Sequence, residues 1–361
     1  MRKRPSGIRG DPVIAGSSFR NCWQIRLEST IFLLFSVGLI LIFSYVPSMD
    51  PLKPPRLKKR DLIGIVTPAS QVLDPSRIER GVSYLERLGY EVLVGANVGK
   101  SHGYLGGTDE ERAADLHAMF RDQRVRMIIC ARGGYGTPRL LQLLDYRLIK
   151  QNPKILVGFS DITALQLAFL AKCGLVTFHA PMLATDMAEP MDPFTEELFW
   201  LLVTSSRKVG AVAFPEPMEA RILRPGLFTG HLVGGNLSIL VSLLATPFQP
   251  ALEHSALFLE EVGEEPYRVD RMLTHLRNAS VLARCRGIMI GQCVDCVPRD
   301  PSRPSLTLEE VLTEFAHAFK KPVIFNVPFG HVKQKMTLPL GVKVRIDPEK
   351  RAIELMEAAV E

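Results

Sequence analysis

A serine, a glutamate and a histidine each follow a short apolar run in this sequence. They are Ser160 after residues 155–159, Glu260 after 257–259 and His331 after 323–325. A hydroxyl nucleophile, an orienting carboxylate and an imidazole base form a catalytic triad, because serine is weakly nucleophilic until a base takes its proton. The three residues therefore predict a hydrolytic site. His179 also ends an apolar run, and it is the alternative base.

The segment around Ser160 has the pattern of a strand, a tight turn and a helix. Such a turn resembles a nucleophile elbow, which lifts a serine hydroxyl clear of a sheet and aims it at a helix N-terminus. The free N–H groups there would stabilise a developing oxyanion. In the alternative interpretation, Ser160 only caps the helix, because serine is a common N-cap residue.

Three glycines in four positions follow residues 125–130, as Gly133, Gly134 and Gly136. Glycine lets the backbone approach a ligand closely. A phosphate cradle is one interpretation, but neither Gly-Lys-Ser/Thr nor Gly-x-Gly-x-x-Gly is present. We prefer an oxyanion hole formed by the N–H groups of Gly134 and Asp161. A glycine-rich turn without a role is the remaining interpretation.

Alternating strand and helix patterns must position these residues. Strands are predicted at 62–66, 91–94, 125–130, 154–158 and 175–178. Asp74 is the expected N-cap of the first helix, a capping box at Thr108 opens the second, the third runs from about Thr137 to Ile149, and the fourth begins at Asp161. This alternation predicts an α/β fold with a parallel sheet covered on both faces. Sites in such sheets lie beyond the carboxyl ends of the strands, where Ser160 and the glycines fall.

The chain divides into four predicted parts. Residues 1–60 form a basic extension, 61–185 the domain that carries Ser160, 186–226 a proline-dotted linker, and 227–361 a second domain that supplies the acid and base. Strands are predicted in the second domain at 256–259, 287–290, 323–325, 342–346 and 352–355, and helices near 267–276 and 307–319. Within it, we interpret Glu261, Glu264 and Glu265 as a solvated acidic loop.

Charge and cysteines exclude several classes of protein. Residues 1–60 hold 11 Lys/Arg against 3 Asp/Glu, whereas the other 301 residues hold 33 against 35. The body is therefore nearly neutral, which argues against nucleic acid as a partner. The six cysteines show no disulfide framework, which favours a reducing compartment. Cys293 and Cys296 form one Cys-x-x-Cys pair, which we interpret as small apolar residues rather than as a zinc or redox site.

An uncharged apolar run covers residues 31–46. Its 16 residues are marginal for a membrane span, which needs about 20. Basic residues lie on both sides and no Ala-x-Ala-like cleavage site follows. We expect a cytoplasmic enzyme that starts at or near Met49, with residues 1–60 packing poorly against the body. The alternative is an inner-membrane anchor through residues 31–46.

Five segments together resemble one known family. They are Ala131–Thr137, Gly158–Thr163, Gly230–Ser238, Leu259–Arg271, and Gly330-His331 with Leu338–Gly341. In this order they are similar to the LD-carboxypeptidases, the S66 family of serine peptidases. That family includes murein tetrapeptide carboxypeptidases and microcin C self-immunity proteins. The resemblance covers residues 61–355 or so and leaves out residues 1–60.

The resemblance implies that Ser160 is the nucleophile, Glu260 the orienting acid and His331 the base. It implies an N-terminal domain like that of class I glutamine amidotransferases, a smaller C-terminal α/β domain and a homodimer. It also implies release of a terminal D-amino acid from a murein peptide, without metal or organic cofactor. Tyr135 and Asn236, within the matching segments, are candidate substrate-binding residues.

A carboxypeptidase must bind a free carboxylate, which arginine can grip with two parallel hydrogen bonds. Arg132 beside the glycines is our first candidate, ahead of Arg268 and Arg271. Surface ion pairing is the alternative for all three.

Two other functions stay open: an amidase that cleaves a peptidyl-nucleotide antibiotic, and a membrane-tethered sensor of wall peptides that has no activity.

Overall fold

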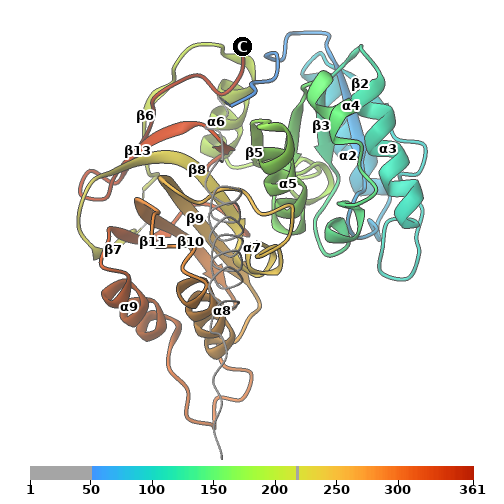
Figure 1. Ribbon diagram of the computed structural model, residues 1–361. Helices are drawn as coiled ribbons and strands as arrows, with labels where there is room; N and C mark the ends of the chain where they lie inside the picture. Colours follow the sequence, from blue (N-terminus) through green and yellow to red (C-terminus); the bar gives the residue numbers. More distant parts are fainter. Residues whose placement is uncertain (1–50, 217–218) are drawn as a thin grey trace, which may run out of the picture. The chain divides into compact units, whose positions relative to one another are not determined.

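The computed structural model describes residues 51–216 and 219–361, and they contain two β-sheets (Figure 1). The first sheet has the strand order β12-β5-β4-β3-β1-β2. Its five parallel strands are β1 (Leu62–Val66), β2 (Glu91–Val94), β3 (Val125–Cys130), β4 (Ile155–Gly158) and β5 (Thr177–His179). The predicted α/β fold with a parallel N-terminal sheet is confirmed.

Helices connect the parallel strands of the first sheet. They are α2 (Ser76–Arg87), α3 (Asp109–Arg121), η1 (Thr137–Leu140), α4 (Tyr146–Gln151), η2 (Ser160–Ile162) and α5 (Thr163–Cys173). The predicted capping box of α3 is present, because Thr108 accepts the N–H of Glu111 and the Glu111 carboxylate accepts the N–H of Thr108. A single helix from Thr137 to Ile149 was predicted, and this is wrong: Asp145 caps a new helix at Tyr146.

The second sheet has eight strands in the order β6-β14-β13-β8-β9-β10-β11-β7. Its centre is parallel: β8 (Phe228–Asn236), β9 (Ser255–Val262), β10 (Gly287–Val294) and β11 (Val323–Val327). Its flanks are antiparallel: β6 (Gly210–Ala213), β7 (Arg221–Arg224), β13 (Lys343–Asp347) and β14 (Ala352–Leu355). The helices of this part are α7 (Leu237–Ser242), α8 (Pro266–Asn278) and α9 (Leu308–Phe319), and α8 packs against α9 (Figure 1).

Two segments connect the two sheets in ways that the sequence did not predict. The stretch 186–226, predicted as a linker, contains the last two residues of η3 (Leu183–Met187), then α6 (Pro193–Thr204) and two edge strands of the second sheet. The segment after His331 crosses back to the first sheet. There, β12 (Leu338–Leu340) pairs antiparallel with β5. Residues far apart in the sequence therefore meet at the carboxyl ends of both parallel centres.

The first described residues pack on the body, contrary to our expectation for residues 1–60. Leu57 is 1% exposed, and its N–H donates to the carbonyl of Val203. Leu52 bridges to Leu175, and the N–H of Arg56 donates to the carbonyl of Glu361. The apolar run 31–46 lies outside the described residues. Within the described ranges, no helix is long and apolar enough to cross a membrane.

Candidate active site

Ser160 lies on a strained turn at the carboxyl end of β4. Its φ of 63° falls in the left-handed region, which non-glycine residues rarely adopt. Gly158 makes the turn feasible, since a Cβ there would lie 2.8 Å from the side chain of Ile162. Strain of this kind persists only where the surrounding structure holds it, and it concentrates at functional sites. The elbow geometry predicted for Ser160 is therefore present, with η2 beginning at Ser160 itself and α5 directly after it.

The glycine loop after β3 packs against this turn. A Cβ on Gly133 would lie 3.0 Å from the Ser160 Oγ, so only glycine leaves that hydroxyl free. Ser70, after β1, holds the loop: its Oγ accepts the N–H of Tyr135, at 3.1 Å. Among the described residues, no hydrogen bond uses the N–H groups of Gly134 and Asp161. Both N–H groups thus lack a protein partner in this part of the chain, and of the two residues Gly134 is exposed and Asp161 is buried.

The Asp161 side chain fastens the turn to the glycine loop. It is 1% exposed, and its Oδ2 accepts the N–H of Thr137 at 2.8 Å. The Thr137 hydroxyl donates to the carbonyl of Asp161. Burial raises the pKa of this carboxyl, while the hydrogen bonds from Thr137 oppose that shift. The Asp161 side chain therefore stabilises the turn, while the backbone N–H of the same residue is the candidate oxyanion-hole donor.

His331 and Glu260 form the hydrogen-bonded pair that a triad requires. The His331 Nδ1 lies 2.7 Å from the Glu260 Oε2, and the Glu260 side chain is fully buried. A carboxylate only accepts hydrogen bonds, so Nδ1 is the donor in this pair when Glu260 acts as a carboxylate, which leaves Nε2 for another partner. Gly330 allows this contact, because a Cβ there would lie 2.7 Å from the same Glu260 oxygen.

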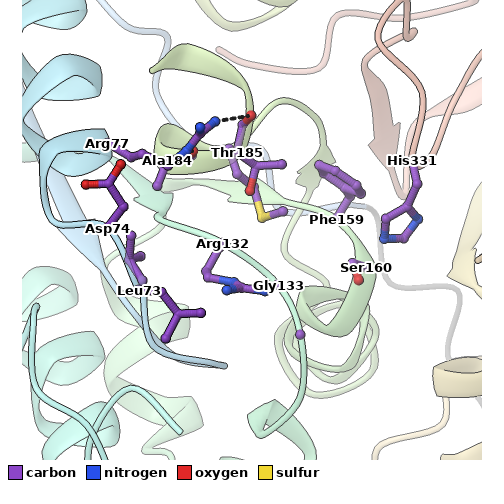
Figure 2. Close-up of a pocket in the computed structure, with 13 residues that line it drawn as sticks. Leu73, Asp74, Arg77, Arg132, Gly133, Phe159, Ser160, Ala184, Thr185 and His331 are labelled. Carbon is purple, nitrogen blue, oxygen red and sulfur yellow. Dashed lines mark hydrogen bonds between the residues drawn. The ribbon is translucent and has the colours of Figure 1, made fainter. Parts of the chain in front are cut away.

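Ser160 and His331 line the same cavity, which has a volume of about 350 Å³. Figure 2 shows Ser160, Phe159 and His331 at one end of it and Leu73, Asp74 and Arg77 at the other. Arg132 and Gly133 lie between the two groups (Figure 2). The other lining residues are Val72, Gly134, Met182, Ala184 and Thr185. The cavity thus joins a candidate nucleophile and base to a pocket for a ligand.

His179, the alternative base, is poorly placed for proton transfer. It is 1% exposed, and neither ring nitrogen has a hydrogen-bond partner in the described part of the chain. Its ring packs against Phe159, Phe258 and Phe329. Burial, with smaller contributions from the charges of His331 and Lys335, lowers its pKa to about 3. These features favour His331 as the base.

The predicted substrate-binding residues differ in where they lie. Arg132 lines the cavity, and one guanidinium N–H donates to the carbonyl of Gln71. Tyr135 is 44% exposed, and its ring is 5.9 Å from that of Tyr104. Tyr135 is not among the residues that line the cavity.

Asn236, Arg268 and Arg271 lie outside the cavity and have protein partners. The Asn236 amide caps α7 and donates to Glu261. Arg268 pairs with Glu264 and Glu265, and both arginines pack on the Tyr267 ring. The described structure thus places only Arg132 of the three arginines beside Ser160.

Sequence reasoning missed or misjudged three acidic and basic residues. Glu261 was assigned to a solvated loop, but it is 3% exposed and accepts hydrogen bonds from Asn236 and Ser238. Asp74 and Arg77 line the cavity, although Asp74 was interpreted only as a helix cap. Their position after β1, on the same edge as Ser160, was the available signal.

Nothing in the described ranges indicates a metal centre. No group of three or more His, Cys, Asp or Glu side chains that could hold a metal is found there. Cys293 and Cys296 are free thiols at the end of β10. The hydrogen bond with Cys296, followed by burial, raises the pKa of Cys293, and the same hydrogen bond lowers the pKa of Cys296.

Comparisons with known proteins agree with this geometry. The LD-carboxypeptidase N-terminal domain matches residues 63–180, and the LD-carboxypeptidase C-terminal domain matches residues 229–346. A probable murein peptide carboxypeptidase of Bacillus subtilis is 39% identical over 310 residues, which are 85% of this chain and 95% of that protein. The chain therefore belongs to the LD-carboxypeptidase family.

Two solved structures share the fold. The microcin C7 self-immunity protein MccF, in complex with aspartyl sulfamoyl adenosine, has a TM-score of 0.80 and 28% identity, and the match covers 86% of this chain and all of that one. A muramoyltetrapeptide carboxypeptidase from Oxalobacter formigenes has a TM-score of 0.71 and 30% identity, with 81% and 97% covered. The family therefore contains proteins named for murein peptide hydrolysis and proteins named for microcin immunity.

Proposed function

We propose that this protein is a serine carboxypeptidase that releases a terminal D-amino acid, such as D-Ala, from murein peptides. The observation that carries the proposal is the His331–Glu260 hydrogen bond of 2.7 Å beside the cavity that Ser160 lines. Relatives named as murein peptide carboxypeptidases support the substrate class. Ser160, His331 and Glu260 act as nucleophile, base and orienting acid.

The reaction follows from the positions of these groups. The Nε2 of His331 takes the Ser160 proton as Oγ attacks the carbonyl of the L-residue. The N–H groups of Gly134 and Asp161 stabilise the oxyanion that forms. His331 then returns the proton to the leaving amine, the D-amino acid departs, and water hydrolyses the acyl-enzyme by the same steps. Glu260 holds the imidazole tautomer and stabilises its charged form.

Arg132 binds the terminal carboxylate of the substrate in this proposal. It lies in the same cavity as Ser160, and only one of its N–H groups has a partner among the described residues. The remaining donors can grip a carboxylate with parallel, charge-assisted hydrogen bonds. This contact explains how an enzyme of this kind selects the last peptide bond.

The alternative function is cleavage of a peptidyl-nucleotide antibiotic by the same three residues. The TM-score of 0.80 to MccF in complex with aspartyl sulfamoyl adenosine favours it. The third function, an inactive sensor, is less well supported. A binding protein has no use for a fully buried carboxylate held against a histidine, since burying a charge is costly.

The experiment compares two substrates on the purified full chain. One is a tetrapeptide ending in D-Ala, with its L-Ala epimer and C-terminal amide as controls; the other is aspartyl sulfamoyl adenosine. We expect D-Ala release from the first peptide alone, and none by Ser160→Ala. Cleavage of the nucleotide conjugate without D-Ala release would establish the alternative. Turnover of neither, by folded protein, would contradict both.

A further inference from the structure

A lysine is buried against the nucleophile turn. Lys335 is 4% exposed, and its ammonium lies 4.3 Å from the centroid of the Phe159 ring. Phe159 immediately precedes Ser160 and is itself 1% exposed. A cation over an aromatic face is attracted by the ring quadrupole, more strongly when water is excluded. Lys335 thus contacts the residue immediately before Ser160.

Lys335 also joins two segments that are far apart in the sequence. Its ammonium forms an ion pair with Asp186, whose other oxygen accepts the N–H of Met182 at 2.8 Å. Asp186 belongs to η3, which supplies the lining residues Ala184 and Thr185. The backbone N–H of Lys335 donates to the hydroxyl of Thr195, at 2.7 Å. The lysine is therefore fixed at both its backbone and its ammonium.

The same segment delivers the proposed base. His331 lies four residues before Lys335, and its ring packs edge-on against Phe159 with centroids 5.1 Å apart. Phe159 thus contacts both the lysine and the histidine. A displacement of the Phe159 ring would move both the turn at Ser160 and the ring surface against which His331 packs.

We propose that Lys335 is a positioning residue that keeps Ser160 in place relative to His331. Its contact with Phe159 fixes the turn before Ser160, and its ion pair with Asp186 fixes η3, which lines the cavity. We call these two contacts together the clamp. The inference rests on the proposed function of Ser160 as a nucleophile. Lys335 acts through Phe159 and Asp186 and is not assigned to the reacting atoms. The clamp maintains the left-handed turn at Ser160, which needs support from outside itself.

A purely structural role explains this arrangement less well. The buried Lys335 and the largely covered Asp186 lose hydration, and replacing a buried ion pair by apolar residues is often neutral or stabilising. A leucine and a methionine would therefore serve for packing alone. The ammonium instead makes a cation–π contact on the nucleophile turn and an ion pair to the cavity wall at once.

The test measures the reactivity of Ser160 with a fluorophosphonate, which phosphorylates the serine oxygen as fluoride leaves and the serine proton passes to the base. Labelling gives a maximal rate and a binding constant separately, so that positioning and binding effects can be told apart. The variants are Lys335→Met, Asp186→Asn and the double variant, which leaves no unpaired buried charge. Lys333→Met is the matched control, because Lys333 is an exposed lysine on the same segment.

We expect Lys335→Met and the double variant to label at least ten times more slowly at saturation, with binding constants within twofold. The control should label like the wild type. A folded double variant with the wild-type maximal rate would overturn the inference, and so would its failure to fold, since the role would then be global stability. Absence of labelling at Ser160 in the wild type would overturn the proposed function itself.

Discussion

The two halves of the candidate site are built in different ways. On the first sheet, backbone geometry places Ser160: a left-handed turn, a glycine at 158 and a glycine loop that leaves room for the hydroxyl. On the second sheet, a side-chain hydrogen bond from His331 to a fully buried carboxylate, Glu260, places the base. The nucleophile therefore depends first on local chain geometry, with the contacts of Lys335 as its proposed support, and the base depends on a side-chain contact with a buried acid.

This difference separates the effects of substitution on the two sides. Truncating Ser160 removes the reacting atom but leaves the turn, because neither the turn's backbone nor the contacts of Phe159 involve the Ser160 hydroxyl. Altering the buried acid on the second side disturbs both the chemistry and the packing.

Removal of the nucleophile or the base should have the largest effect. We expect Ser160→Ala and His331→Ala each to lower kcat by roughly three orders of magnitude or more, and the double variant to be little worse, because the residues act as a unit. Steady-state release of D-Ala measures this. Ser83→Ala and His317→Ala, both exposed, are the controls. An inactive His179→Ala with an active His331→Ala would identify His179 as the base instead.

Substitution of the buried acid tests the second side alone. Glu260→Gln keeps the size of the side chain but removes the charge that holds the His331 tautomer. We expect kcat to fall by roughly two to four orders of magnitude, as for the loss of a triad carboxylate. Thermal unfolding should also shift, since Glu260 is buried, whereas Glu264→Gln should leave kcat unchanged. A wild-type kcat in Glu260→Gln would show that His331 needs no orienting acid.

Arg132 lies in the glycine loop of the first side, and its substitution should affect substrates selectively. Arg132→Lys removes the two-pronged grip on a carboxylate but keeps the charge. We expect kcat/KM to fall by roughly ten- to a hundredfold on the free-acid peptide, the loss of a charge-assisted hydrogen bond, and to change little on its amide. Arg268→Lys is the control. Equal losses on both peptides would remove Arg132 from carboxylate binding.

The smallest effect concerns His179, which packs between the halves without a proposed part in the reaction. Its pKa is about 3 in the folded state, against about 6.5 when unfolded. The unfolded chain thus binds more protons between these values, so stability is lost as the pH falls below 6.5. From pH 7 to pH 5, this one group should cost about 2 kcal/mol.

Urea unfolding at pH 7 and pH 5 measures that loss. The variant His179→Phe keeps a ring at this site and removes the titration. Its loss of stability between the two pH values should therefore be smaller than that of the wild type. An equal loss in both proteins would show that His179 is not held neutral.

The sequence predicted the first side better than the second. Short apolar runs followed by helical periodicity gave the strands β1 to β4 nearly residue by residue, because parallel strands alternate with helices along the chain. Ser160 and Gly134 could be placed for the same reason. Local patterns also gave the capping box at Thr108.

The second side depends on contacts that local patterns do not record. The strand β12 is three residues long and joins the sheet that lies earlier in the chain. Glu261 looked solvated because glycine and two further glutamates follow it, yet hydrogen bonds from Asn236 and Ser238 satisfy it in the core. Lys335 gave no signal, since a lone lysine near a histidine usually lies on the surface.

The central claim is that the hydroxyl on the first sheet and the pair on the second form one reacting centre. Rapid mixing with a D-Ala-terminated tetrapeptide, acid quenching and mass analysis of the intact protein test it directly. We predict a transient adduct with the mass of the tripeptide acyl group, located on Ser160 by peptide mapping and absent from Ser160→Ala. An adduct on another residue, or unchanged turnover by Ser160→Ala, would contradict the account.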